Sequence, residues 1–167
     1  MNRVLAALAC VLSAAPGAGC IHSDVRPDPT SLAGTWTLQA ADKLLPDGTR
    51  VPDYGAHPDG RLMVDDQGRY TLAIFKAERP DFVSPDKARG TDTEIRAAML
   101  GSSCHHGTLR IDRVAGTLTF LIEDATFPNW RGQTQVRAFE RKGDVLTYRL
   151  PARPDGSVPI SVWRREH

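Results

Sequence analysis

The chain has 167 residues, of which 41% are hydrophobic and 25% are charged, and its formal net charge is +1. This length and composition suffice for one domain with an ordinary core and are too small for two. Lys and Arg are scattered along the chain rather than clustered, so the sequence lacks the electrostatic footprint of a nucleic-acid-binding protein. We therefore predict a single folded domain with no nucleic-acid partner.

The first 20 residues have the organisation of a secretory signal peptide. A positive start at Arg3 precedes an apolar run from Val4 to Ala15, and a small-residue segment then ends at Cys20. The apolar run is shorter than the roughly 20 residues that cross a bilayer as a helix, so it does not predict a retained membrane span. We predict an exported protein, either periplasmic or anchored to a membrane of the bacterial envelope.

Two processing outcomes compete at the end of this signal. The segment that ends at Cys20 resembles a bacterial lipobox, in which the Cys is lipidated, although Gly17 stands where Leu is usual. Ordinary cleavage near the same point is the alternative. Residues 21–31 are rich in Asp and Pro, which is typical of a flexible tether, and residues 32–167 then form the folded domain.

Short alternating segments separated by turn residues dominate this domain. In the first, 35–40, the side chains of Trp36, Leu38 and Ala40 share one face, which is the period of a half-buried strand. Residues 51–60 contain Pro, Gly and Asp and predict a loop over one end of the fold, with Tyr54 in it. The remaining predicted strands are 61–65, 69–75, 105–113, 117–123, 133–141, 145–150 and 159–164.

One short helix is predicted between the third and fourth strands. Thr91 and Glu94 have the spacing of a capping box, Ile95 and Met99 share a face, and Gly101 is placed to end the helix. We expect this helix to lie over the mouth of the fold. Eight strands with hairpin spacing then predict an all-β, eight-stranded antiparallel up-and-down barrel, since closure removes exposed edges. A sandwich of two sheets is the alternative.

The sequence resembles the bacterial and fungal lipocalin-like domain family over residues 32–164. Gly34-Thr35-Trp36 is similar to the Gly-x-Trp that opens the first strand of lipocalins. The other matching motifs are Pro46-Asp47-Gly48, Tyr54-Gly55, Gly68-Arg69-Tyr70, Phe127-Pro128-Asn129-Trp130, and Gln135 with Arg137 and Phe139-Glu140. The resemblance implies a small barrel with a cavity, which carries a hydrophobic molecule or supports isomerase or cyclase chemistry.

The resemblance also implies a structural pair at the closed end of the barrel. Lipocalins often place an Arg of the last strand over the indole of the first, which here means Trp36 with Arg164, or with the adjacent Arg165. A buried cation–π contact suits both side chains. We assign Trp36 and Arg164 to stability rather than to ligand contact.

The sixth predicted strand offers polar candidates for the interior. If Phe139 faces inward, alternation places Arg137 and Gln135 on the same face. A buried Arg is costly unless it is paired, and its partner would be Glu123 or an acidic group of a ligand. In the opposite register Val136 faces inward and the Arg lies in solvent.

Three further polar side chains follow from the same alternation. Counting back from Leu109, His105 faces inward if no bulge occurs at Gly107, either as a ligand contact or as a hydrogen-bonded structural residue. Tyr70 and Tyr148 also face inward, where their hydroxyls line the cavity or their rings pack in the core. The candidate ligand-binding residues are therefore Tyr54, Tyr70, His105, Gln135, Arg137 and Tyr148.

The sequence predicts neither a metal site nor a cofactor. Adjacent residues on a strand point to opposite faces, so Cys104, His105 and His106 cannot converge on one ion, and no further ligand lies at zinc spacing. Motifs for nucleophilic catalysis or phosphate binding are also missing from the sequence. We predict an exported barrel that binds a small, largely apolar molecule. The alternatives are an isomerase or cyclase in which His105 or Arg137 polarises a carbonyl, and an envelope interaction module with a filled barrel.

Overall fold

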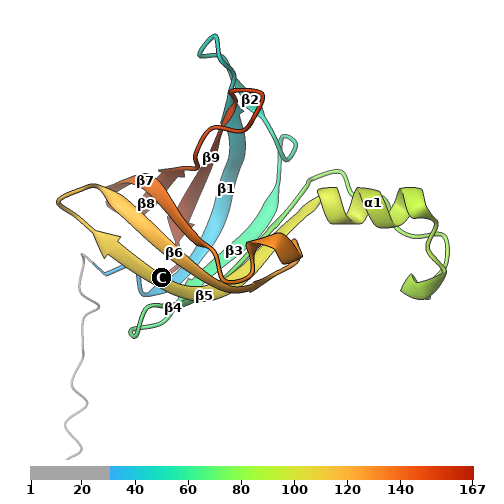
Figure 1. Cartoon of the computed structure of the whole chain (residues 1–167), viewed down its shortest axis with the longest axis horizontal. Helices are drawn as coiled ribbons and strands as arrows, with labels where there is room; N and C mark the ends of the chain where they lie inside the picture. Colours follow the sequence, from blue (N-terminus) through green and yellow to red (C-terminus); the bar gives the residue numbers. More distant parts are fainter. Residues whose placement is uncertain (1–30) are drawn as a thin grey trace, which may run out of the picture.

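A computed structural model describes residues 31–167. The predicted signal peptide, Cys20 and all but the last residue of the predicted tether lie outside these residues. The described chain forms an antiparallel sheet in the order β2-β1-β3-β4-β5-β6-β7-β8-β9, and β1 also pairs with β9, which closes the sheet (Figure 1). The predicted eight-stranded antiparallel barrel is confirmed, and the two-sheet sandwich is wrong.

The elements follow the predicted order with one additional strand. The strands are β1 (Gly34–Leu44), β2 (Arg50–Pro52), β3 (Asp59–Val64), β4 (Arg69–Phe75), β5 (Ser102–Asp112), β6 (Thr117–Ala125), β7 (Thr134–Lys142), β8 (Val145–Arg149) and β9 (Val158–Arg165). The helices are the 3-10 turns η1 (Lys87–Arg89) and η2 (Pro128–Trp130) and the α-helix α1 (Asp92–Leu100). The segment predicted as a loop over residues 51–60 begins inside β2, which pairs with the end of β1.

A bulge in β1 changes which side chains reach the core. Trp36 and Leu38 are buried as alternation predicts, but the pairing of β1 with β9 shifts between Leu38 and Ala40. The inward side chain after the bulge is therefore Ala41, at 4% exposure, rather than Ala40. Bulges bend a strand and increase its twist, which suits β1 because it pairs with β3 near its start and with β2 at its end.

The barrel is filled with side chains around Trp36. This indole is fully buried, and its Nε1 donates a hydrogen bond to the Leu32 carbonyl oxygen at 2.8 Å. Other side chains with no more than 1% exposure form the same core, each contributing roughly 1.5–3 kcal/mol by burial. They are Leu62, Leu72, Leu118, Phe120, Leu146, Tyr148 and Trp163.

The Arg over the Trp36 indole is Arg165, and the assignment of Arg164 is wrong. The Arg165 Cζ lies 4.8 Å from the indole centroid, and the Arg141 Cζ lies 5.4 Å from it. In the β1–β9 pairing, Trp36 is opposite Arg165 and Thr37 is opposite Arg164. Opposite residues of an antiparallel pair share a face, so Arg164 points outward and is exposed.

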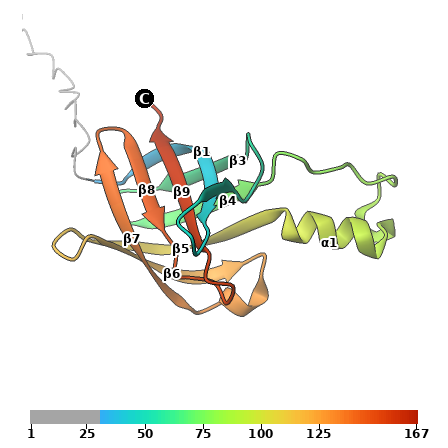
Figure 2. The ribbon, with the colours of Figure 1, turned by 90° about the horizontal axis from the view of Figure 1, so that it is seen from above.

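The helix α1 forms where predicted but does not cover the barrel mouth. Its capping box between Thr91 and Glu94 is present, and the Gly101 N–H donates to the Ala97 carbonyl oxygen at 2.8 Å. Figures 1 and 2 show that α1 extends away from the barrel beyond the start of β5, and none of its residues is buried. With three charged residues among nine, it presents too little apolar surface to offset the cost of docking. No helix in residues 31–167 is long and apolar enough to cross a membrane.

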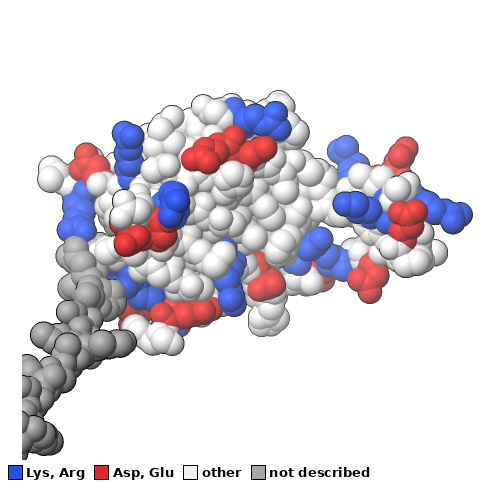
Figure 3. Space-filling model, turned by 90° about the horizontal axis from the view of Figure 1, so that it is seen from below, with Lys and Arg blue, Asp and Glu red and all other residues white. Residues whose placement is uncertain are grey.

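Charged side chains are dispersed over the face of the molecule shown in Figure 3, where basic and acidic groups intermingle. Ion pairs on the surface of the barrel include Arg50 with Asp42 at 2.7 Å and Arg69 with Asp65 at 2.6 Å. Exposed pairs of this kind contribute little to stability. They leave no large patch of one sign on the face in view.

Candidate ligand-binding site

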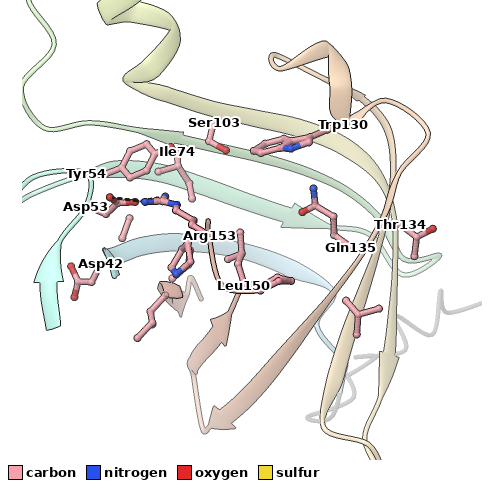
Figure 4. A pocket seen from close by; sticks show the side chains of 16 residues that line it. Asp42, Asp53, Tyr54, Ile74, Ser103, Trp130, Thr134, Gln135, Leu150 and Arg153 are labelled. Atoms are coloured by element: carbon pink, nitrogen blue, oxygen red, sulfur yellow. Dashed lines mark hydrogen bonds and ion pairs between the residues drawn. The ribbon is translucent and has the colours of Figure 1, made fainter. Parts of the chain in front are cut away.

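A cavity of about 460 Å³ opens at the end of the barrel where β2 and the loop between β8 and β9 lie. Its size falls within the range of about 300–1,000 Å³ that is usual for small-molecule sites. Its lining includes Tyr54, Ile74, Ser103, Trp130 and Leu150, which surround it in Figure 4, and also Ile160. The barrel is thus hollow at this end.

An ion pair joins two loops at the cavity mouth. Asp53, which follows β2, accepts two hydrogen bonds from Arg153 of the β8–β9 loop, at 3.1 and 2.6 Å, and Lys43 lies 3.5 Å away (Figure 4). Burial acts to raise the pKa of Asp53, but the hydrogen bonds and charge of Arg153, with the charge of Lys43, hold this pKa below the usual range. Burial, and then the charge of Asp53, raise the pKa of the neighbouring Tyr54. The mouth therefore carries the Arg153 guanidinium, whose charge is balanced by Asp53, and the protonated phenol of Tyr54.

Trp130 forms part of the cavity wall and was not among the predicted site residues. It ends the short turn η2, which begins at Pro128, and its ring meets Phe127 edge-on at 5.7 Å between centroids. Its other neighbour is the His105 ring, at 5.9 Å. The motif Phe127-Pro128-Asn129-Trp130, which contributed to the family resemblance, was the signal that could have identified it.

Beneath the cavity, His105 joins two buried polar side chains. Its Nε2 lies 3.3 Å from the Arg137 Nη2, and its Nδ1 lies 2.8 Å from the Tyr70 hydroxyl. Since a guanidinium can only donate, Nε2 is the acceptor, and in a neutral imidazole the proton then resides on Nδ1. The imidazole therefore donates from Nδ1 to the Tyr70 oxygen.

The His105 ring is neutral at physiological pH. Burial, and then the electrostatic effects of Arg137 and of His106, lower its pKa to about 3. The same burial raises the pKa of Tyr70. Both groups are therefore uncharged, and His105 is a weak base.

Arg137 is buried at 3% exposure, so the inward register of β7 is confirmed, and the alternative register with Val136 inward is wrong. Its Nη2 donates to the Gln135 Oε1 at 2.8 Å, and its Cζ lies 3.9 Å from the Phe120 ring centroid and 5.0 Å from that of Tyr148. Burial lowers the pKa of Arg137, but a guanidinium remains protonated in proteins. A positive charge is therefore buried next to Gln135, which lines the cavity.

The predicted partner Glu123 does not pair with this guanidinium. In the β5–β6 pairing, His106 is opposite Asp124 and Gly107 is opposite Ile122, so Glu123 is the extra residue of a bulge. Because the extra residue is on β6, the alternation of β5 continues through Gly107 and His105 stays inward. Glu123 lies outside the barrel, 3.8 Å from His106. Among residues 31–167, no three His, Cys, Asp or Glu side chains are grouped as metal ligands would be.

The six candidate residues thus fall into two layers. Tyr54 and Gln135 line the cavity, whereas the other four, Tyr70, His105, Arg137 and Tyr148, form a buried cluster beneath it. The Gln135–Arg137 hydrogen bond connects the two layers. Their roles in ligand binding remain predictions.

The sequence matches the model of the lipocalin-like domain family over residues 33–165. The chain belongs to this family. This lipocalin-like protein is 28% identical over 79 residues to the 4'-hydroxy-3'-methoxypropiophenone carrier protein of Aspergillus oryzae, covering 44% of this chain and 71% of that protein.

Two solved structures are similar to this lipocalin-like barrel at low sequence identity. A lipocalin-like protein from Bacteroides uniformis is 14% identical with a TM-score of 0.41, over 81% of this chain and 98% of that one. A mutant of the fluorescent protein UnaG is 16% identical with a TM-score of 0.33, over 80% of this chain and 95% of that one.

Proposed function

We propose that this lipocalin-like protein is an exported carrier that binds a small, largely apolar molecule in the cavity at the open end of its barrel. The observation that carries the proposal is a space of about 460 Å³ with an apolar wall and a few polar groups at its mouth and floor. The similar Aspergillus oryzae protein, named as a carrier of 4'-hydroxy-3'-methoxypropiophenone, supports it.

The buried polar cluster favours binding over catalysis. A general base works best when its pKa is close to the working pH, whereas His105 has a pKa of about 3. Its two ring nitrogens are already engaged by Arg137 and Tyr70. This arrangement orients a ligand rather than removing a proton from it.

Export is the second part of the proposal and rests on the sequence of residues 1–20. An intact mass of the protein purified from a bacterial envelope fraction tests it. A mature chain that begins at Cys20 and carries a diacylglycerol indicates membrane anchoring. A chain that has lost the signal segment and carries no lipid indicates a soluble exported form. A chain that retains residues 1–20 contradicts export.

Ligand binding can be tested with N-phenyl-1-naphthylamine, a neutral probe that fluoresces in apolar sites. We expect saturable binding to the purified protein. Ser103→Phe places a ring in the cavity and should weaken this binding about tenfold or more, since the ring occupies space in which the probe would bury its own apolar surface. Met63→Phe is the matched control because Met63 is 47% exposed on the outer face of β3. Absence of saturable binding, or equal binding by both variants, contradicts the proposal.

A further inference from the structure

The Arg137 guanidinium is a buried charge without a counterion. No described carboxylate forms an ion pair with it, and its hydrogen-bond acceptors are the neutral Gln135 and His105. Contacts with the faces of Phe120 and Tyr148 offset part of the cost. A buried charge is otherwise stable only when it is paired with an opposite one. The site thus lacks one negative charge.

The same cluster has more donors than acceptors. The Arg137 Nε and the Tyr148 hydroxyl are both buried and neither forms a hydrogen bond of good geometry, although the hydroxyl lies close enough to the guanidinium to act against the lowering of its pKa. The Tyr70 oxygen accepts from His105 Nδ1, which leaves the Tyr70 hydroxyl proton available. Buried polar groups in native proteins are nearly always satisfied, so a set of unsatisfied donors needs an explanation.

Gln135 is the link between these donors and the cavity. Its side chain lines the cavity, and its amide oxygen accepts the Arg137 Nη2 hydrogen at 2.8 Å. The amide oxygen therefore occupies a position suited to an oxygen of a bound molecule. Rotation of the Gln135 side chain would open the guanidinium to a ligand in the cavity.

Arg153, the other guanidinium at the cavity, is not available for this role. It already donates two hydrogen bonds to Asp53, at 3.1 and 2.6 Å. A bidentate pair of this geometry satisfies both charges. An anionic group in the cavity would therefore find its partner at Arg137, with its apolar body against Trp130 and Leu150, which line the cavity.

We infer that the ligand of this protein is an amphipathic acid, whose carboxylate or equivalent oxyanion binds Arg137, Tyr148 and Tyr70 beneath an apolar body. The inference rests on the proposed carrier function and names the chemical class of its ligand. The anion would supply the missing negative charge and the missing acceptors together.

The test compares two probes with the same aromatic frame. N-phenyl-1-naphthylamine is neutral, and 8-anilinonaphthalene-1-sulfonate adds a sulfonate that stands in for the carboxylate. Arg137→Met should weaken binding of the sulfonate probe about tenfold or more, because a hydrogen bond to a charged group usually contributes that much. The same substitution should change binding of the neutral probe less than about twofold. Arg149→Met removes the same charge from the exposed face of the adjacent strand β8 and should change neither affinity.

The outcomes separate this inference from the carrier function. If the neutral probe binds saturably but Arg137→Met affects both probes equally, the ligand class is wrong and the carrier function stands. If neither probe binds, both proposals fail. Tyr148→Phe removes a single unsatisfied hydroxyl and preserves the ring, so it serves if Arg137→Met does not fold. Tyr148→Phe should weaken binding of the sulfonate probe about threefold or more without affecting binding of the neutral probe. The absence of this selective loss of affinity overturns the inference.

Discussion

Acidification from pH 7 to pH 5 should destabilise this protein because His105 is buried in its neutral form. The pKa of His105 is lowered to about 3 in the folded chain, chiefly by burial, whereas an unfolded His has a pKa of about 6.5. Between these values the unfolded state binds the extra proton and the folded state does not, so stability falls as the pH falls. At about 1.4 kcal/mol for each pH unit below 6.5, the loss at pH 5 is about 2 kcal/mol.

Urea unfolding followed by circular dichroism at pH 7 and pH 5 measures this loss. His105→Gln removes the titrating group and should reduce the difference in unfolding free energy between the two pH values by about 2 kcal/mol. His106→Gln, on the exposed outer face next to it, should leave the difference unchanged. Asp53 changes the stability only at a pH below this range of 5 to 7, because its pKa in the folded protein lies below the usual carboxyl range. The same pH dependence in wild type and His105→Gln would refute the reasoning.

Two substitutions test the architecture of the barrel by chemical denaturation. Gly107→Ala should cost about 3 kcal/mol, because a Cβ there would lie 2.0 Å from the Leu121 carbonyl oxygen, and a loss below about 0.5 kcal/mol would contradict this close approach. Arg165→Met should cost about 1–2 kcal/mol through the lost contact with Trp36. Arg164→Met on the outer face should change stability by less than about 0.5 kcal/mol. Equal losses of stability in the two variants would contradict the assignment of Arg165 to the indole.

Part of the candidate site followed from alternation within single strands. The inward orientation of Arg137 was predictable from Phe139 two residues later, and that of His105 from Leu109. The same reasoning applied to Trp163 would have selected Arg165 rather than Arg164 as the inward Arg of β9. Alternation assigns a side chain to a face, but it does not say what that side chain meets there.

The contacts across the barrel could not be predicted in this way. Tyr70 and His105 belong to the adjacent strands β4 and β5, whereas Arg137, which meets His105, comes from β7 on the far side of β6. The ion pair between Asp53 and Arg153 joins residues 100 positions apart in the chain. Such meetings depend on the register of every intervening strand pair, and a one-residue shift reverses the face of each side chain.

The sequence by itself determined the local elements of this protein. The alternation of 61–75 about the turn at Gly68 specified the hairpin β3–β4, and Thr91 with Glu94 specified the start of α1, because these structures depend on backbone preferences of neighbouring residues. Only the tertiary structure decided where α1 projects, that β2 forms and that a cavity remains above the floor around Arg137. Those outcomes depend on how much apolar surface each segment can bury against distant ones, which neighbouring residues do not encode.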